Sequence, residues 1–174
     1  MALPNDYSRQ SCSLARSLEI VGERWTLLIV RDAFYGVRRF GDFVAHLDIP
    51  RAVLTSRLRT LEAEGVMTRT PGSSGHDEYE LTDKGVRLWP VVRDLMAWGD
   101  EYYAPKGPRR VLRHDADQGA LKPDGTCQVC GATVGVAETV IAPGPGFAAY
   151  GRLRQDAVSE ALAEPRRLLE PLRS

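Results

Sequence analysis

The segment DIPRAVLTSRLRTLEAEGVMTRT, from Asp48 to Thr70, reads as a turn, a helix and the start of a strand. Proline is favoured in the first turn of a helix and glycine just after its end. A helix is therefore predicted from Pro50 to Glu64, with Gly65 as its stop. On a helical wheel of about 100° per residue, its leucines cluster within about 60° of one another. This apolar stripe predicts a core-facing side made of Leu54, Leu58 and Leu61.

The opposite side of this predicted helix carries small residues, hydroxyl groups and arginines. Small side chains let a helix approach another surface closely, while hydroxyl and guanidinium groups can contact base edges and flanking arginines can hold phosphates. An amphipathic helix that only packs against a core would show the same leucine stripe. We predict a DNA-contacting face formed by Arg51, Ala52, Thr55, Ser56, Arg57 and Arg59.

The neighbouring elements favour the DNA-binding interpretation. RRFGDFVAHL, residues 38–47, predicts a short helix that a tight turn joins to the helix above. VMTRT and EYELT flank a turn rich in glycine, serine and proline, and they predict a β-hairpin. A short helix, a turn, a second helix and a hairpin form a winged helix-turn-helix arrangement. We expect Arg39, and Arg69 and His76 of the hairpin, to contribute further DNA contacts.

The rest of the chain predicts additional helices and a distinct tail. Residues 12–36 predict two helical pieces, and residues 83–103 predict a longer helix that Pro90 either kinks or begins. From residue 104 onward the sequence predicts a linker, short strands and turns, and a final amphipathic helix broken at Pro165. The predicted fold class is mainly α with a β-hairpin wing, plus a small β-rich C-terminal tail ending in a helix. We expect two parts, residues 8–104 and residues 105–174.

Net charge alone does not indicate the partner. The 174 residues include 23 basic and 23 acidic side chains, so the formal net charge is zero. The distribution is uneven, because residues 38–59 carry five arginines and only two aspartates. Such a basic island fits a small nucleic-acid contact surface, although a solvated helix face would show the same excess.

Several function classes are disfavoured. The sequence has no apolar run of about 18 residues and no basic-then-apolar leader, so we expect a cytoplasmic, nucleoid-associated protein without membrane contact. It has no glycine-rich phosphate loop, and its three histidines fall on different predicted elements without a nearby nucleophile. We therefore expect a protein that is not an enzyme.

Four motifs resemble a known family. GERWTLLI (Gly22–Ile29), RFGDF (Arg39–Phe43), LTSRLRTLEAEGV and YELTDKG are similar to segments of the HxlR family of bacterial winged helix-turn-helix transcriptional regulators. The resemblance covers roughly residues 10–103. It implies a homodimer that binds palindromic operators in double-stranded DNA and dimerises through its terminal helices. It also implies that the helix from Pro50 to Glu64 enters the major groove, while the hairpin reaches the neighbouring backbone.

The chain departs from this family pattern just before that helix. The family commonly has Gly-Ile-Ser there, whereas this sequence has Asp48-Ile49-Pro50. Proline has no backbone N–H, so any phosphate contact from that amide is lost here.

Cys12 lies at the start of the first predicted helix. The dipole of a helix lowers the pKa of a thiol at its N-terminus, and Arg9 and Arg16 are close in sequence. The resemblance implies redox sensing by Cys12, since several family members have an N-terminal cysteine that senses electrophiles or oxidants. The alternative is a half-buried cysteine that packs as a small apolar residue.

CQVCGA, which contains Cys127 and Cys130, resembles a zinc knuckle, in which two thiolates lie on a tight turn closed by glycine. A tetrahedral site needs two more ligands; His114 is available upstream, and Asp117 is close. Gln118-Gly119 stands where some relatives carry Cys-Gly. Three interpretations stay open: a partial zinc ribbon held by Cys127, Cys130 and His114, a reversible disulfide, and two packed thiols.

The leading functional hypothesis is a homodimeric DNA-binding repressor controlled by thiol oxidation or by a small effector. The alternative is a winged-helix protein-interaction module with a metal- or ligand-sensing tail, which the zero net charge favours. The salt dependence of DNA binding separates the two hypotheses, because phosphate contacts release counterions.

Overall fold

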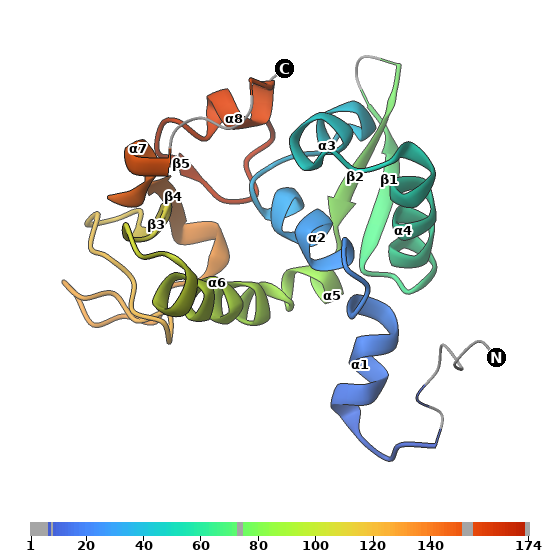
Figure 1. Ribbon diagram of the computed structural model, residues 1–174, viewed down its shortest axis with the longest axis horizontal. Coiled ribbons are helices and arrows are strands. Elements are labelled where there is room, and N and C mark those ends of the chain that lie inside the picture. Colours follow the sequence, from blue (N-terminus) through green and yellow to red (C-terminus); the bar gives the residue numbers. More distant parts are fainter. Residues whose placement is uncertain (1–6, 8, 73–74, 151–154, 173–174) are drawn as a thin grey trace.

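Helices dominate the first third of the chain. The computed structural model describes residues 7, 9–72, 75–150 and 155–172 (Figure 1). Its first helices are α1 (Ser13–Val21), α2 (Thr26–Phe34), α3 (Phe40–Leu47) and α4 (Arg51–Ala63). In Figure 1, α1 projects away from the rest of the molecule, while α2 and α3 lie close together beside α4. None of the helices in the described ranges is both long and apolar enough to cross a membrane.

Helix α4 has the two-sided character that its sequence predicts. The leucines of its inner stripe are at most 1% exposed: Leu54, Leu58 and Leu61. Asp48 adopts a left-handed conformation (φ 55°) at the end of α3, which turns the chain sharply toward α4. Pro50 is the capping residue before Arg51, one position earlier than the first helical position predicted for it. Gly65, with a φ of +65°, follows the end of α4, in the conformation that favours glycine.

The predicted hairpin is present and forms the wing. Strands β1 (Met67–Pro71) and β2 (Asp77–Leu81) pair antiparallel, with Arg69 opposite Tyr79. Tyr79 is buried, so one side of the wing packs on the helices while the other faces solvent. Residues 73–74 of the predicted turn lie outside the described residues.

The predicted longer helix is divided into two helices. They are α5 (Asp83–Val86) and α6 (Trp89–Tyr103). Pro90 falls in the first turn of α6, where its missing N–H leaves no helical hydrogen bond unmade. Thr82 caps α5, because its hydroxyl accepts a hydrogen bond from the Gly85 amide at 3.2 Å. Pro90 therefore lies in the first turn of the second helix. Of the two predicted outcomes, a kink or a helix start, the structure shows the helix start.

The C-terminal tail is built around a three-stranded antiparallel sheet in the order β3-β4-β5. Its elements are β3 (Arg110–His114), the 3-10 turn η1 (Val136–Glu138), β4 (Thr139–Pro143), α7 (Gly146–Tyr150), α8 (Ala157–Ala161) and β5 (Arg166–Arg167). The β-rich character agrees with the prediction. The final amphipathic helix is shorter than predicted, since the chain beyond Pro165 forms strand β5 along β4 instead of resuming a helix. Pairing with β4 outweighs the local helical pattern.

The last described residues return to the winged-helix part. The Leu169 amide donates to the Phe34 carbonyl at 2.8 Å, and the Leu172 amide donates to the Gly36 carbonyl at 2.9 Å. Gly36 has a φ of +90°, and a Cβ atom there would lie 1.9 Å from the Glu170 carbonyl oxygen. Only glycine fits this crossing of two backbone segments.

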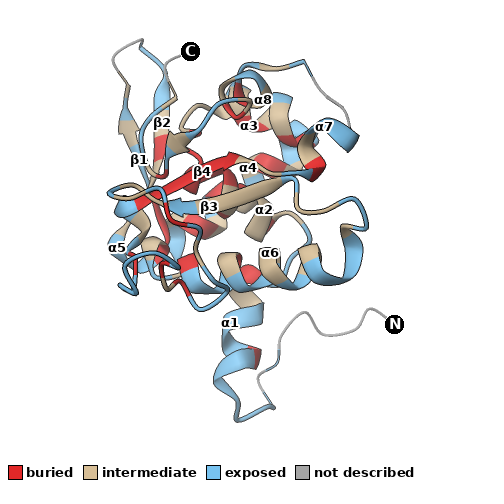
Figure 2. Ribbon diagram, turned by 90° about the vertical axis from the view of Figure 1, so that its left-hand side faces the viewer, coloured by how far each residue is buried: buried red, intermediate tan, exposed pale blue. Residues whose placement is uncertain are grey.

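One hydrophobic cluster spans the predicted boundary between residues 8–104 and residues 105–174. Apolar side chains of α2, α3 and α4 share this cluster with four buried residues from the tail: Ile141, Val158, Leu162 and Leu168. Figure 2 shows β4 as a largely buried strand running through the middle of the molecule. The tail thus packs on the winged-helix core and covers part of its apolar surface.

Candidate DNA-binding surface and cysteine sites

The solvent side of α4 carries the polar residues that the sequence predicts. Four of them are exposed: Arg51, Ala52, Ser56 and Arg59. Thr55 is partly buried, and its hydroxyl donates to the Arg51 carbonyl within the same helix at 2.9 Å. The exposed side chains thus lie opposite the buried leucine stripe, on the surface available to a partner.

Two arginines of this face have no acidic partner among the residues that the structure describes. The Arg51 guanidinium lies over the ring of Phe40, 5.2 Å from the ring centroid, which holds the side chain at the beginning of α4. Arg59 makes no hydrogen bond or ion pair within the described part of the chain. Both cations are free of a carboxylate that a phosphate would have to displace.

Arg57 is placed differently. Its guanidinium lies 3.6 Å from the Glu23 carboxylate, in the segment between α1 and α2. It also donates to the Ser56 hydroxyl at 3.3 Å. The side chain is 24% exposed and is directed along the protein surface. Phosphate contact by Arg57 stays a prediction, and it would compete with the ion pair to Glu23.

The wing arginines also have acidic neighbours. Arg69 lies 3.5 Å from Glu62 of α4 and 3.3 Å from Asp77 of β2, and about half of its side chain is exposed. Arg39 lies 4.0 Å from Glu78 of β2. These pairs link the wing to the helices, and they reduce the local positive charge around α4.

A second set of contacts anchors the wing and was not predicted from the sequence. Arg38 forms an ion pair with Glu80 at 2.6 Å, and its carbonyl accepts the Tyr79 amide at 2.8 Å. The connection between α2 and α3 therefore lies along β2 like a short third strand. The predicted contact residue His76 is exposed, close to the hairpin tip.

Cys12 occupies the predicted position at the start of α1. It is the N-cap residue and is exposed. The backbone N–H groups of Ala15 and Leu14 lower the pKa of the Cys12 thiol, because they stabilise the thiolate. Arg16, proposed as a further influence, forms an ion pair with Glu19 at 3.1 Å.

The other two cysteines lie beside the predicted histidine. His114 is the last residue of β3, and Cys127 and Cys130 are in the loop before β4. The Cys130 sulfur lies 3.5 Å from Nδ1 of His114. Cys127 is buried, whereas Cys130 is exposed, and neither is in a disulfide. The three residues predicted as metal ligands are therefore brought together.

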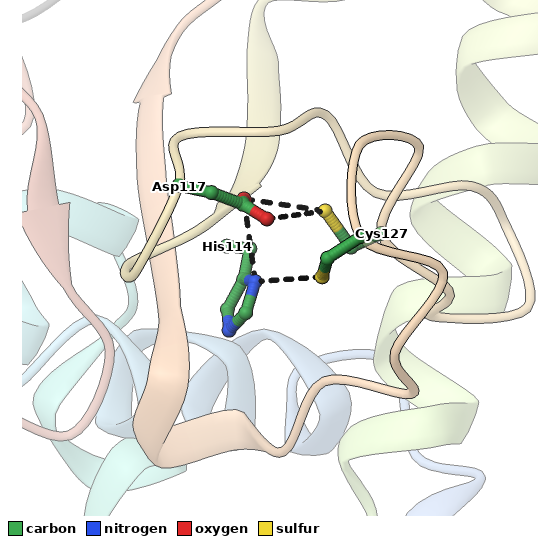
Figure 3. Close-up of side chains that lie close together, drawn as sticks. His114, Asp117 and Cys127 are labelled. Atoms are coloured by element: carbon green, nitrogen blue, oxygen red, sulfur yellow. Dashed lines mark hydrogen bonds and ion pairs between the residues drawn. The ribbon is translucent and has the colours of Figure 1, made fainter.

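Asp117 joins this group. Its Oδ1 atom lies 3.3 Å from the Cys127 sulfur and 3.3 Å from Nδ1 of His114 (Figure 3). The Gly119 amide donates to Oδ1 at 2.9 Å and is the main reason that the pKa of Asp117 is lowered to about 2. Sequence inspection placed Asp117 near the site but looked for a further cysteine at residues 118–119. The Asp117 carboxylate, and not a further cysteine, lies beside Cys127 and His114.

A comparison with known protein families matches the winged-helix part of the chain. The family described as HxlR-like helix-turn-helix matches residues 20–107. The chain belongs to the HxlR family. The matched residues include α2, α3, α4, the wing and α6, so the match covers the candidate DNA-binding surface.

Individual HxlR-like relatives extend the similarity into the tail. The uncharacterised HTH-type transcriptional regulator Rv3095 of Mycobacterium tuberculosis is 47% identical over 140 residues, which are 79% of this chain and 89% of that protein. The HTH-type regulator YvaP of Bacillus subtilis is 37% identical over 93 residues, 52% of this chain and 86% of that protein. The crystal structure of PA1607, a candidate transcription factor, has a TM-score of 0.61 and 38% identity, covering 76% of this chain and 94% of PA1607. The protein is thus a transcriptional regulator of the helix-turn-helix type.

One buried polar group of this HxlR-family chain was also missed by sequence inspection. The Asp32 side chain on α2 is fully buried and accepts from Arg31 at 2.7 Å, and it lies 2.6 Å from Nδ1 of His46 on α3. This contact fixes α2 against α3, and so positions the helix before α4. The sequence signal was a pair of adjacent charged residues, Arg31 and Asp32, in a helix that is mostly apolar.

Proposed function

We propose that the protein binds operator DNA as a homodimer and represses transcription. The observation that carries this proposal is the exposed outer face of α4 beside a hairpin wing, where Arg51 and Arg59 have no acidic partner among the described residues. An arginine can contact guanine bidentately in the major groove, and a wing can reach the flanking backbone. Arg59, at the middle of the face, is assigned to base contact, and Arg51 and Arg57 are assigned to phosphate contact.

The dimer is supported by apolar side chains that are exposed on two helices. Helix α1 buries only Ala15 and Val21 of its own residues, although it projects from the molecule. Exposed hydrophobic residues occur on both α1 and α6: Leu14, Leu18, Val91, Leu95, Trp98, Tyr102 and Tyr103. Exposed apolar side chains grouped on a helix mark an interaction site, and the dimerisation through terminal helices that the HxlR resemblance implies favours a second copy as the occupant. A two-fold dimer would read a palindromic operator.

A cavity between α6 and the tail is large enough for a small effector. A cavity of about 180 Å³ lies between α6 and β3, lined by Met96, Leu112 and Leu121 with Arg93 and Arg110 at its edge. An engineered apolar cavity of about 150 Å³ binds benzene, so this hollow has room for one aromatic ring. Arg93, Arg110 and Lys122 line the cavity against one carboxylate, Asp100, and this positive excess favours a compound that also carries a carboxylate.

The test is fluorescence anisotropy of the protein with DNA from upstream of its own gene. Arg59→Ala should weaken binding by about 1–3 kcal/mol and relax specificity at one base position, because a base contact is lost. Arg57→Ala should weaken binding evenly across sequences and reduce the salt slope by about 1. Arg87→Ala is the control, since Arg87 is exposed on the turn between α5 and α6 and is not part of the predicted DNA-contacting face of α4.

Two outcomes would contradict parts of this proposal. Unchanged binding by both Arg59→Ala and Arg51→Ala would refute the assignment of α4 as the recognition helix. DNA binding without salt dependence would favour the alternative function, a protein-interaction module, which the neutral net charge and the acidic partners of Arg39, Arg57 and Arg69 support. Sedimentation of a monomer at micromolar concentration would refute the homodimer.

A further inference from the structure

The loop between β3 and η1 has very little hydrophobic core of its own. Among residues 115–135, the buried positions are Gly119, Gly125, Cys127 and Val134. Only one of these, Val134, is an aliphatic side chain of any size. Long connections without regular structure are uncommon in compact domains, and segments too small to bury a core are held by disulfides or metals. This loop is therefore held by something other than apolar packing.

Four potential metal ligands from three places in the chain converge inside this loop. His114 ends β3, Asp117 lies in the next turn, and Cys127 and Cys130 belong to the CQVCGA turn. One donor atom from each of the four lies within 4.8 Å of all the others. Figure 3 shows the side chains of His114, Asp117 and Cys127 directed toward one another.

Three of the distances among these atoms match the edges of a tetrahedron around a metal ion, and the remaining pairs lie within 4.8 Å. With metal–ligand bonds of about 2.0–2.3 Å, the ligand atoms of a tetrahedral zinc site lie about 3.3–3.8 Å apart. The observed distances are 3.3 Å from Cys127 Sγ to Asp117 Oδ1, 3.3 Å from His114 Nδ1 to Asp117 Oδ1, and 3.5 Å from Cys130 Sγ to His114 Nδ1. A bound ion would draw the wider-spaced pairs closer, while these three distances already suit a tetrahedral shell.

The backbone around the four residues supports such a site. The Val129 amide points at the Cys127 sulfur, 3.4 Å away, and would donate to a bound thiolate. Gly131 has a φ of +73° and closes the turn after Cys130. A Cβ atom at Gly119 would lie 2.5 Å from the Cys127 sulfur, so glycine is required where the turn of Asp117 meets that sulfur. Hydrogen bonds to the ligands orient them as outer partners do in metal sites.

We propose that His114, Asp117, Cys127 and Cys130 bind one zinc ion in a structural site. Two thiolates and an imidazole are the ligands that zinc prefers, and a carboxylate oxygen is a known fourth ligand. The four protein ligands complete a tetrahedral shell and leave no position for a substrate. The sulfur ligands disfavour magnesium and calcium, which take oxygen ligands.

The site would hold the tail against α6. The Arg93 side chain of α6 is 13% exposed and packs over Gly125, where a Cβ atom would lie 2.2 Å from the guanidinium. Gly125 is two residues before Cys127, so a metal bound at Cys127 fixes the segment on which Arg93 rests. Because α6 also carries exposed aromatic residues, the metal would stabilise the helix that presents them.

The test is the metal content of the full-length protein, purified and assayed under reducing conditions and incubated with equimolar zinc before desalting. Wild-type protein should retain one zinc per chain by mass spectrometry of the metal, and Cys127→Ser with Cys130→Ser should retain none. Cys12→Ser is the matched control and should retain one, because Cys12 is exposed on α1. Zinc should also protect two of the three wild-type thiols from maleimide, a readout that does not depend on any variant folding.

The fourth ligand needs its own measurement. In cobalt-substituted protein, Asp117→Ala should keep the thiolate-to-metal absorption but change the tetrahedral ligand-field bands, and it should weaken zinc binding at least about tenfold. Identical cobalt spectra and zinc affinity in Asp117→Ala and wild type would refute Asp117 as a ligand. No zinc retention and no thiol protection in reduced wild-type protein would overturn the site altogether, whatever the DNA-binding result.

Discussion

At the scale of single residues, the ion-pair partner of an arginine decides whether its guanidinium is available to bind DNA. Arg57 and Arg59 are two positions apart on the same helix, yet Arg57 lies beside Glu23 and Arg59 has no such partner within the described residues. A phosphate that binds Arg57 must displace a carboxylate, whereas one that meets Arg59 need not. Residue type and spacing placed both arginines on the correct side of α4, but they could not distinguish the two, because Glu23 is remote in sequence.

Cys12 should react at lower pH than an ordinary thiol. The amides at the beginning of α1 lower its pKa from the usual value of 9.0, so its thiolate is populated at pH values where an unperturbed thiol is protonated. The alkylation rate of Cys12, followed by mass spectrometry against pH, should therefore have a midpoint below 9.0.

The same protein unfolded in denaturant provides the reference for this experiment, since it lacks the helix. Equal midpoints in folded and unfolded protein would show that α1 does not activate the thiol. If Cys12 is the sensor, oxidant should also release DNA from wild-type protein and leave the Cys12→Ser complex intact.

At the scale of elements, glycine and proline made most of the boundaries predictable. The leucine stripe and Gly65 defined α4, and Pro90 marked the start of α6. Strand β5 was not predictable, because Arg166 and Arg167 have no strand pattern and are extended only through pairing with β4. Local sequence carries signals for caps and stripes, whereas a two-residue strand depends on a neighbour distant in the chain.

Gly36→Ala tests the close contact between the backbone at the end of α2 and the backbone of residues 169–172. Alanine would need a positive φ and would place its Cβ atom against the Glu170 carbonyl. We expect the free energy of unfolding to fall by at least about 1–3 kcal/mol, the cost of a strained backbone position, with the clash adding to it. Chemical denaturation followed by tryptophan fluorescence measures the change.

Gly41→Ala is the control for that substitution. Gly41 lies in α3, has no positive φ, and a Cβ atom there would meet nothing within 4 Å. Alanine in a helix should raise stability by about 0.5–1 kcal/mol. A neutral Gly36→Ala would show that the terminal segment does not pack on α2 in solution.

At the scale of the whole molecule, the shared core makes the tail part of the winged-helix fold. Leu168 is 2% exposed and belongs to the same hydrophobic cluster as Phe34 and Trp89. Leu168→Ala should therefore lower the free energy of unfolding by about 2–5 kcal/mol, through lost burial and a residual cavity. The fluorescence of Trp89 reports on the packing of this cluster, because the centroid of its ring lies 5.0 Å from the centroid of the Phe34 ring.

Val129→Ala is the matched control, because Val129 is 70% exposed and should change stability very little. The transition seen by tryptophan fluorescence should shift in Leu168→Ala and stay single. A shifted unfolding transition in far-ultraviolet circular dichroism, with the tryptophan fluorescence transition unchanged, would instead support two independently folding parts.

The candidate metal cluster shows where sequence reasoning stopped short. The C-x-x-C spacing and His114 indicated three possible ligands, although a disulfide or two packed thiols would give the same sequence pattern. Asp117 was noted only as a nearby residue, because the direction of its side chain depends on the Gly119 amide that holds it. Side-chain direction in an irregular loop is a tertiary property, and sequence spacing does not encode it.

The attachment of β2 to both β1 and the segment at Arg38 has a consequence for the operator. Because β2 is bonded on both sides and Arg69 of the wing pairs with Glu62 of α4, the wing and α4 are expected to move little relative to each other. In the proposed homodimer, the double helix would then have to bend or twist until its grooves meet two such surfaces. Base pairs between the half-sites, untouched by any side chain, would influence affinity through their own deformability.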